Sequence, residues 1–274
     1  MASRTIDTGT EVVLAEVCDS IGLITLNRPE RRNALHREMY PAIRATLAEF
    51  AQAEDVTCIV VTGAGDGFCA GGDVRDGRGR ASGDVAPSID EAAAALLEDA
   101  QVSRLLHESS KLTVAAVNGA AVGAGLAIAL ACDLRVVAPN AKLIPGWGKL
   151  AFSGDFGGTW FLAHLIGPSR ALEMLIANTA VDGADAVVLG LANHVTTGDD
   201  FAAEWRAWVA PFAAGPRAAI ALMKENVNQA MVDPLESALV DESRRMVISA
   251  RTADHREAVR AWLDKREPNF GSHA

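Results

Sequence analysis

The stretch TVAAVNGAAVGAGLAIALA, Thr113–Ala131, decides the fold of this 274-residue chain. Its first five residues, Thr113–Val117, form a continuous apolar run of the kind found in strands buried on both faces. The small residues of Asn118–Gly125 then predict a tight turn, and Leu126–Ala131 predicts the helix that this turn opens. A buried strand that passes through a glycine-rich turn into a helix is typical of an α/β protein.

A second turn of the same kind lies upstream. Cys58–Thr62 is another buried-strand pattern, Gly63–Gly67 ends it, and Gly67–Val74 reads GFCAGGDV. Small residues at the start of a helix let a ligand approach the backbone, where unpaired N–H groups and the positive end of the helix dipole face it. Two such turns that converge on one carbonyl oxygen would form an oxyanion hole. Either turn alone is weak evidence, because glycine turns join strands to helices in many α/β proteins.

Strand, turn and helix patterns alternate to about residue 195, whereas only helical patterns follow. Val12–Val17 and Ile21–Leu26 predict a hairpin around Cys18-Asp19-Ser20, and Leu134–Val137 and Ala141–Ile144 predict short strands. The helical patterns after residue 200 are Phe201–Phe212, Pro216–Met231, Pro234–Ser249 and Ala253–Lys265. Helices with no strand to cover usually pack on a neighbour. We therefore expect an α/β core over residues 1–200 and a helical oligomerisation region over residues 201–274.

Two longer helices are predicted within the core. The first, Arg37–Ala53, has an apolar stripe of Ile43, Leu47 and Phe50. The second, Asp90–Glu108, has an apolar side predicted at Ala93, Leu96, Leu97 and Leu105. Between them, Gly77–Pro87 is rich in Gly, Ser and Asp and predicts a mobile excursion.

Composition narrows the class of function. The chain has 35 acidic and 25 basic residues, a formal net charge of −10, which argues against a nucleic-acid partner. Its scattered cysteines form no C-x-x-C pair and have no nearby His, so we expect free thiols and no metal site. The N-terminus lacks a signal-peptide core, and the longest apolar stretch is shorter than the ~20 residues that span a bilayer. We expect a cytoplasmic protein without a membrane partner.

Four motifs together make the pattern specific: Asn27-Arg28-Pro29 followed by Ala34-Leu35, then Phe68–Asp73, Val117–Gly125 and Asp155–Thr159. In this order they resemble the enoyl-CoA hydratase/isomerase, or crotonase, family over essentially the whole chain. The resemblance implies a spiral of ββα turns with a C-terminal helical trimerisation region, assembled as a homotrimer or homohexamer. It also implies an acyl-CoA thioester substrate, with coenzyme A as part of the substrate and no separate cofactor.

The same resemblance implies the residues of the site. The oxyanion donors fall on the backbone N–H groups of Gly72 and Ala124, each typically worth about 3 kcal/mol in the transition state. A backbone donor needs no side chain, so Ala in place of the usual Gly at 124 is tolerable. Arg32, together with Arg28 and Arg31, supplies positive charge for the phosphates of CoA, and Phe270 resembles a tail residue that packs on a neighbour's CoA. The implied substrate-binding residues are Ala34, Ala70, Gly71, Gly123, Trp147, Arg32 and Phe270.

The acid/base groups depart from the family's hydratases. Those enzymes add water with two glutamates, and the matching positions here are Ala127 and Trp147, neither of which carries a proton. Asp155 is the remaining candidate, although an Asp just before a helix is also a preferred N-cap. The segment Lys149–Trp160 is similar to that of the phenylacetate-pathway epoxide and enoyl-CoA isomerases, in which the matching Asp shuttles the proton. We expect an apolar pocket to raise the pKa of Asp155 toward the working pH.

Three functions stay open on this basis. Isomerisation through a thioester enolate needs only one base, Asp155. Water chemistry is the alternative, with Asp155 activating water or attacking as a nucleophile, and the third is an acyl-CoA-binding protein without turnover. The spacing of Trp147 and Asp155 is similar to that in 4-chlorobenzoyl-CoA dehalogenases, but the His used there falls at Ala100. We expect Asp73 to cap its own turn and His107 to lie on a solvated face.

Overall fold

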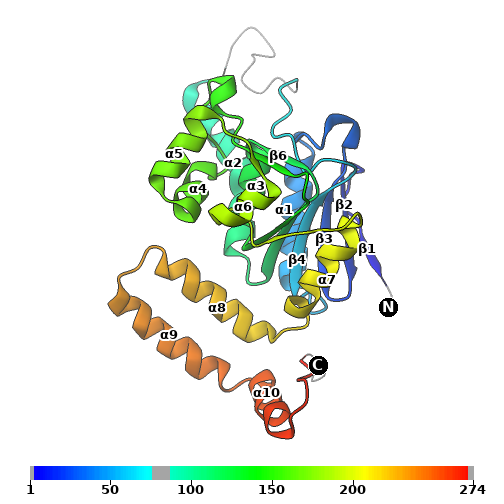
Figure 1. The fold of residues 1–274 in the computed structure, drawn as a ribbon, viewed down its shortest axis with the longest axis vertical. Helices are drawn as coiled ribbons and strands as arrows, with labels where there is room; N and C mark the ends of the chain where they lie inside the picture. Colours follow the sequence, from blue (N-terminus) through cyan, green and yellow to red (C-terminus); the bar gives the residue numbers. More distant parts are fainter. Residues whose placement is uncertain (1–2, 76–86, 271–274) are drawn as a thin grey trace.

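The computed structural model describes residues 3–75 and 87–270 of the chain (Figure 1). Within this part a seven-stranded sheet has the order β1-β2-β3-β4-β5-β7-β10. The pairings among β1, β2 and β3 are antiparallel, and all later pairings in this order are parallel. The strands are β1 (Arg4–Ile6), β2 (Val13–Cys18), β3 (Ile21–Leu26), β4 (Cys58–Gly63), β5 (Leu112–Val117), β7 (Leu134–Val137) and β10 (His194–Val195). The predicted excursion over Gly77–Pro87 lies, except for Pro87, outside the described residues.

The predicted hairpin at Cys18-Asp19-Ser20 is confirmed. Asp19 and Ser20 both have positive φ angles, 52° and 63°, as a two-residue turn between twisted antiparallel strands requires. Cys18 pairs with Ile21 and Val13 pairs with Leu26, so the register continues along the whole hairpin. Together with β1, the hairpin forms the antiparallel end of an otherwise parallel sheet.

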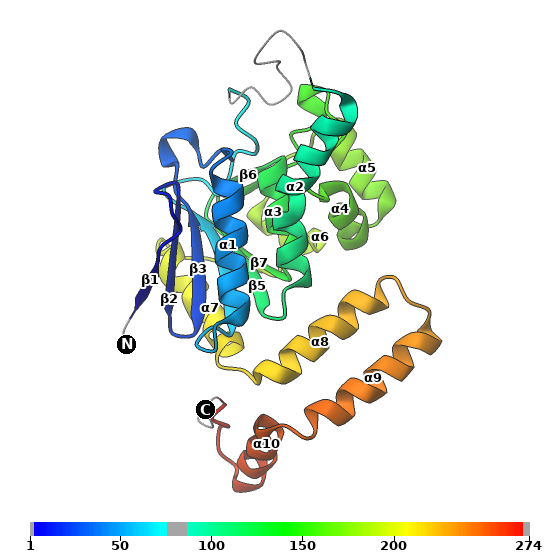
Figure 2. The same ribbon diagram turned by 180° about the vertical axis from the view of Figure 1, so that it is seen from behind.

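Helices cover both faces of the sheet (Figures 1 and 2). α1, α2 and α3 lie on one face, where the apolar stripe Ile43, Leu47 and Phe50 is buried as predicted. α7 lies on the other face, where Trp205 and Val209 pack against residues of the central strands. The α-helices up to residue 213 are α1 (Met39–Gln52), α2 (Ile89–Glu108), α3 (Ala124–Ala131), α4 (Gly158–Ile166), α5 (Pro168–Ala177), α6 (Gly183–Leu189) and α7 (Phe201–Ala213).

A second, smaller layer forms where the chain leaves the carboxyl ends of the parallel strands. Its strands are β6 (Ala120–Val122), β8 (Lys142–Ile144) and β9 (Val181–Asp182), in the order β6-β8-β9. Single bridges from Cys69 to Ala121 and from Leu35 to Gly72 extend this layer. Both glycine turns therefore lie in one layer, beside the segment that ends at Leu35.

The C-terminal helices extend away from the sheet, with α8 and α9 side by side (Figures 1 and 2). They are α8 (Arg217–Ala230), α9 (Leu235–Ser249) and α10 (Ala253–Asp264), which agree with the predicted helices to within two residues. α9 buries none of its residues and α8 buries only Lys224. Apolar side chains such as Val240, Val247 and Trp262 are consequently exposed in the single chain.

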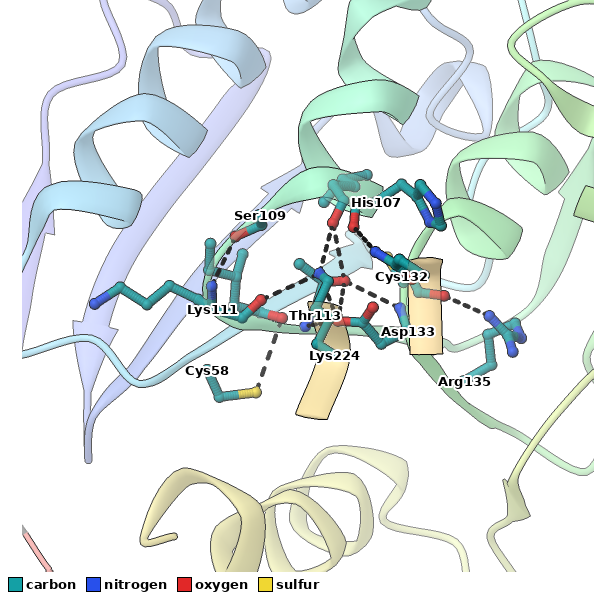
Figure 3. A network of polar contacts seen from close by, with 12 residues as sticks. Cys58, His107, Ser109, Lys111, Thr113, Cys132, Asp133, Arg135 and Lys224 are labelled. Atoms are coloured by element: carbon teal, nitrogen blue, oxygen red, sulfur yellow. Dashed lines mark hydrogen bonds and ion pairs between the residues drawn. The ribbon is translucent and has the colours of Figure 1, made fainter. Parts of the chain in front are cut away.

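A buried polar network joins α8 to the core (Figure 3). The Lys224 ammonium pairs with Asp133 at 2.8 Å and donates to the carbonyl oxygens of Leu106 and Lys111. Asp133 also accepts from the backbone N–H and the hydroxyl of Thr113. The ammonium thus satisfies the carbonyl end of α2 as well as a carboxylate, which fixes α8 against the sheet.

Two expectations about α2 are wrong. Leu96 and Leu97 are exposed, and the buried residues of the helix are Val102, Ser103 and Leu106. Among the described residues, 89–98 are all exposed, so this half of the helix buries none of its apolar side chains. His107 is not on a solvated face, because it is half-buried against the rings of Trp160 and Phe161. Burial, followed by the nearby Lys224 charge, lowers the pKa of His107.

Candidate active site

The two glycine turns meet at the carboxyl edge of the parallel sheet, after β4 and β5. The backbone N–H of Cys69 donates to the Ala120 carbonyl at 3.0 Å, and the N–H of Val122 donates to the Cys69 carbonyl at 2.9 Å. Carboxyl ends of parallel strands are where α/β proteins usually bind ligands. The two glycine turns are therefore neighbours in the structure, joined by backbone hydrogen bonds.

Hydrogen bonds set the direction of the Gly72 N–H. The Gly71 carbonyl accepts from the Leu35 N–H at 2.8 Å. In a trans peptide the following N–H points the opposite way, so the Gly72 N–H points away from Leu35. Because residues 69–72 lie between residue 35 and the β6 segment, this direction is toward the second turn. Among the described residues, the Gly72 N–H has no hydrogen-bond acceptor.

The Ala124 N–H is oriented by the same rule. The carbonyl of Gly123 accepts from the Ala127 N–H at 2.9 Å, so it points along α3. The Ala124 N–H then points off the N-terminus of the helix, where a first-turn donor has no intrahelical acceptor. Each turn thus has one backbone N–H, that of Gly72 or Ala124, directed away from its own hydrogen-bonded segment.

Glycine is required at position 71 for the turns to approach each other. Its φ is +87°, and a Cβ there would lie 2.8 Å from the Val122 carbonyl oxygen and 3.7 Å from the Ala124 backbone nitrogen. A side chain would push the two turns apart. Gly71 therefore sets the distance between the two backbone donors.

Asp155 lies next to this pair of turns. The indole Nε1 of Trp147 donates to Asp155 Oδ1 at 2.7 Å. A Cβ at Gly123, the residue before the α3 donor, would lie 3.9 Å from the same Nε1. The carboxylate is thus held near the N-terminus of α3, with one oxygen occupied by the indole.

Burial shapes the acidity of Asp155. Desolvation is the larger influence and raises the pKa of its carboxyl, while the Trp147 hydrogen bond opposes that shift. Its neighbour Phe156 is 4% exposed, and the centroid of its ring lies 5.8 Å from that of Tyr40. A partly buried carboxyl with a raised pKa is a stronger base than an ordinary exposed Asp, which suits it to proton transfer.

The two positions at which the family resemblance implies glutamates in hydratases are Ala127 and Trp147 in this chain. Ala127 is fully buried in α3, and Trp147, which precedes the short 3-10 helix Gly148–Leu150, is 4% exposed. The Trp147 ring lies on the backbone of Gly158, where any Cβ would overlap it. Sequence reasoning missed this role of Gly158, because the Gly157-Gly158 pair alone does not indicate which ring it contacts.

The predicted substrate-binding residues divide into three groups. Ala34, Ala70 and Gly71 lie in adjacent segments, since the Ala70 N–H donates to the Arg32 carbonyl. Gly123 and Trp147 lie beside Asp155, as described above. Phe270 lies apart from the glycine turns, in a groove that Trp205, Arg217 and the β2–β3 hairpin line.

The arginines near residue 30 are not equivalent. Arg31 and Arg32 are exposed. Arg28, in contrast, pairs with Asp73 at 3.1 Å and donates to the Ala34 carbonyl at 2.6 Å, and its expected role toward the CoA phosphates stays a prediction. Asp73 also accepts from the Arg75 N–H, which confirms that it caps its own turn.

Two features are absent from the part of the chain that the structure describes. In residues 3–75 and 87–270, no three His, Cys, Asp or Glu side chains gather as a metal ion would require. Over the same ranges, none of the helices has both the length and the apolarity needed to cross a membrane.

The parallel sheet, the second layer of short strands and the turns between them define a protein of the crotonase fold. An enoyl-CoA hydratase from Polaromonas sp. JS666, solved by crystallography, matches it with a TM-score of 0.87 and 30% identity, covering 94% of this chain and 98% of that one. The sequence profile of the enoyl-CoA hydratase/isomerase family matches residues 16–273. The chain belongs to that family of acyl-CoA enzymes.

Some relatives in the family are named hydratases and others isomerases. A probable enoyl-CoA hydratase from Rhodobacter capsulatus is 34% identical over 93% of this chain and 96% of its own length. The 1,2-epoxyphenylacetyl-CoA isomerase of Escherichia coli K12 is 32% identical over 95% of this chain and 98% of its own length. Similarity at this level supports the family and leaves hydration and isomerisation as separate possibilities.

Proposed function

We propose that this protein isomerises an acyl-CoA thioester, by moving a double bond or rearranging a ring, through an enolate. The observation that carries the proposal is the Trp147–Asp155 pair beside the glycine turns, with alanine at position 127. Asp155 takes a proton from carbon, and the electron pair moves to the thioester oxygen. The N–H groups of Gly72 and Ala124 form the oxyanion hole that stabilises this charge. Asp155 then returns the proton to a different carbon.

One carboxylate is sufficient for this reaction and is a poor match for hydration. Adding water calls for one group to activate the water and another to protonate carbon. Asp155 is the single carboxylate that we assign to the site, and one of its oxygens already accepts from Trp147. The remaining oxygen, Oδ2, is the one that we assign to the proton transfer.

The test follows atoms into the product. Purified protein is mixed with 2-enoyl, 3-enoyl and aryl-CoA esters in heavy-oxygen, deuterated water, and the products are analysed by mass spectrometry. We expect deuterium exchange or a shifted double bond without heavy oxygen. Asp155→Asn should lower this turnover by at least about a hundredfold and leave ester binding intact.

Hydration is the second candidate, because several relatives are named enoyl-CoA hydratases. It predicts heavy oxygen in the product of the same experiment, and that result would replace the isomerase proposal. Tight ester binding without turnover by either protein would instead indicate a non-catalytic acyl-CoA-binding member.

The coenzyme A part of the substrate is assigned to the segments beside the first turn. We propose that backbone around Ala34, Ala70 and Gly71 holds the adenine and pantetheine, and that Arg31 and Arg32 face the phosphates. No cofactor beyond the CoA of the substrate enters this scheme. Gly123 and Trp147 line the acyl side.

The assembly is proposed to be a homotrimer or homohexamer that works in the cytoplasm. The support is the exposed apolar surface of residues 217–264. Within this region, no residue of α9 is buried in the single chain. Phe270, which lies away from the glycine turns of its own chain, is proposed to pack on the CoA bound by a neighbouring copy.

A further inference from the structure

Arg28 and Asp73 form a partly buried ion pair at the edge of the first glycine turn. Arg28 Nη2 lies 3.1 Å from Asp73 Oδ2, and the two side chains are only 14% and 13% exposed. The residues are 45 positions apart in the sequence, so the pair joins two separate segments. Such a pair is costly to desolvate and is stable only when further hydrogen bonds complete it.

Those further bonds are present. The second guanidinium nitrogen of Arg28 donates to the Ala34 carbonyl at 2.6 Å. The other carboxylate oxygen of Asp73 accepts from the Arg75 N–H at 3.1 Å. Two of the five N–H donors of Arg28 and both carboxylate oxygens of Asp73 are thereby used within the protein.

The pair closes a ring of contacts around Gly72. Leu35 donates its N–H to the Gly71 carbonyl and accepts the N–H of Asp73 at 3.0 Å. Arg28 connects Ala34, the residue before Leu35, to the side chain of Asp73, the residue after Gly72. Gly72 therefore lies between two residues, Gly71 and Asp73, that backbone hydrogen bonds and one ion pair hold in place. Gly72 itself has no side chain that could fix its position.

We propose that Arg28 and Asp73 are positioning residues that hold the Gly72 N–H in line with the Ala124 N–H. The inference rests on the proposed function, because it concerns the oxyanion hole assigned there. Arg28 acts through the Ala34 carbonyl and Asp73, and neither side chain touches the substrate. A donor that shifts by about 1 Å loses much of its value in the transition state.

The competing role for Arg28 is the one expected from the sequence, a charge for the CoA phosphates. The two roles predict different effects. A phosphate contact makes Arg28→Met weaken ester binding and leaves Asp73→Asn without effect. A positioning pair makes Arg28→Met and Asp73→Asn act alike, on the polarisation of the thioester carbonyl and on kcat, with little change in affinity.

The test uses a thioester whose colour reports on the hydrogen bonds to its carbonyl. The probe is 4-dimethylaminocinnamoyl-CoA, whose absorption moves to longer wavelength when the carbonyl oxygen is polarised. Its dissociation constant and its wavelength shift are measured with the wild type, Arg28→Met, Asp73→Asn, Arg28→Lys and the double variant Arg28→Met/Asp73→Asn. Arg4→Met serves as the control, because it removes an Arg–Asp pair of similar length, 2.9 Å, on the exposed side of the sheet.

We expect both single variants and the double variant to lose at least half of the wavelength shift, with dissociation constants within about threefold of the wild type. Where turnover is measurable, kcat should fall about ten- to a hundredfold. Arg28→Lys should restore part of the shift, because an ammonium replaces one of the two contacts of the guanidinium fork. The double variant leaves no unpaired charge, so it separates loss of positioning from loss of folding.

Two results overturn the inference, and they are distinguishable. A normal wild-type shift that both single variants retain would show that the pair does not position Gly72. A wild type that binds no ester, or binds it without a shift, would remove the oxyanion hole and the proposed function together.

Discussion

At the scale of single residues, the site depends on one carboxylate and the ring that holds it. Trp147 occupies a position where hydratases of the family carry a glutamate, and its N–H is bound to Asp155. In the proposed site, the indole takes the place of a second acid and orients the carboxylate of Asp155. Desolvation raises the pKa of Asp155, and the indole hydrogen bond limits that increase.

Trp147→Phe tests this balance. Without the N–H donor the ionised carboxylate loses a stabilising bond, so the pKa of Asp155 should rise further. A base works only when deprotonated, so the acid limb of the profile of kcat/KM against pH should move to higher pH. The comparison is Trp208→Phe, a ring that stacks on His194 away from the site. An unchanged limb in Trp147→Phe would argue that Asp155 is not the titrating base.

Gly158→Ala tests the support of the indole. An added Cβ would overlap the Trp147 ring, so the ring must move away from Asp155. We expect about 1–3 kcal/mol of lost stability, as for other overpacked sites, together with a lower kcat. Gly67→Ala is the matched control, because a Cβ there meets nothing within 4 Å. Chemical denaturation and steady-state kinetics provide the measurements, and equal effects of the two variants would contradict the assignment.

At the scale of elements, neighbouring segments hold the glycine turns and a buried network holds the C-terminal helices. The first turn lies between the segment at Leu35 and β6, so its geometry is determined by long-range backbone bonds. α8, in turn, is fixed to the end of α2 by Lys224. Polar contacts of this kind specify one arrangement, whereas apolar contacts alone allow several.

Lys224→Met should therefore be strongly destabilising. It leaves the Asp133 carboxylate, which is 15% exposed, without its cation and removes donors from the carbonyls of Leu106 and Lys111. The expected loss is about 3 kcal/mol in the free energy of unfolding, measured by urea denaturation. Lys142→Met removes an exposed pair with Asp182 at 3.7 Å and should cost less than about 1 kcal/mol. A Lys224→Met protein as stable as the wild type would show that the network does not hold α8.

At the scale of the whole molecule, the main unexplained surface is that of α8 to α10. Val240 and Val247 are 67% and 52% exposed and lie seven residues apart on α9, hence on one face of the helix. Exposed apolar surface of this extent is typical of a protein–protein interface.

Val240→Glu/Val247→Glu tests whether copies of the chain meet at this surface. The wild type should sediment as a trimer or hexamer, and the charged variant as a smaller species, because two carboxylates cannot be buried unpaired. Glu236→Gln, on the same helix, is the control and should keep the wild-type mass. A monomeric wild type would contradict the proposed assembly.

Much of the fold was predictable from short sequence patterns. The hairpin, the parallel strands β4, β5 and β7, α1 and the four C-terminal helices follow from runs and periods that lie within one element. The strands β1, β6, β9 and β10 and the helices α5 and α6 were not predicted, since they are short or carry weak patterns. The exposed half of α2 shows the same limit, because its apolar residues have the right period but are not buried among the described residues.

For the site, the sequence alone determined which chemical groups are present: two glycine turns, alanine at position 127, and Asp155. Only the tertiary structure decided how they are used. It brought Trp147 onto Asp155, placed the indole against Gly158, and paired Arg28 with Asp73, 45 positions away in the sequence. The physical reason is that residue type and local period are properties of a segment. Hydrogen bonds and close contacts between segments depend on distances that exist only once the chain has folded.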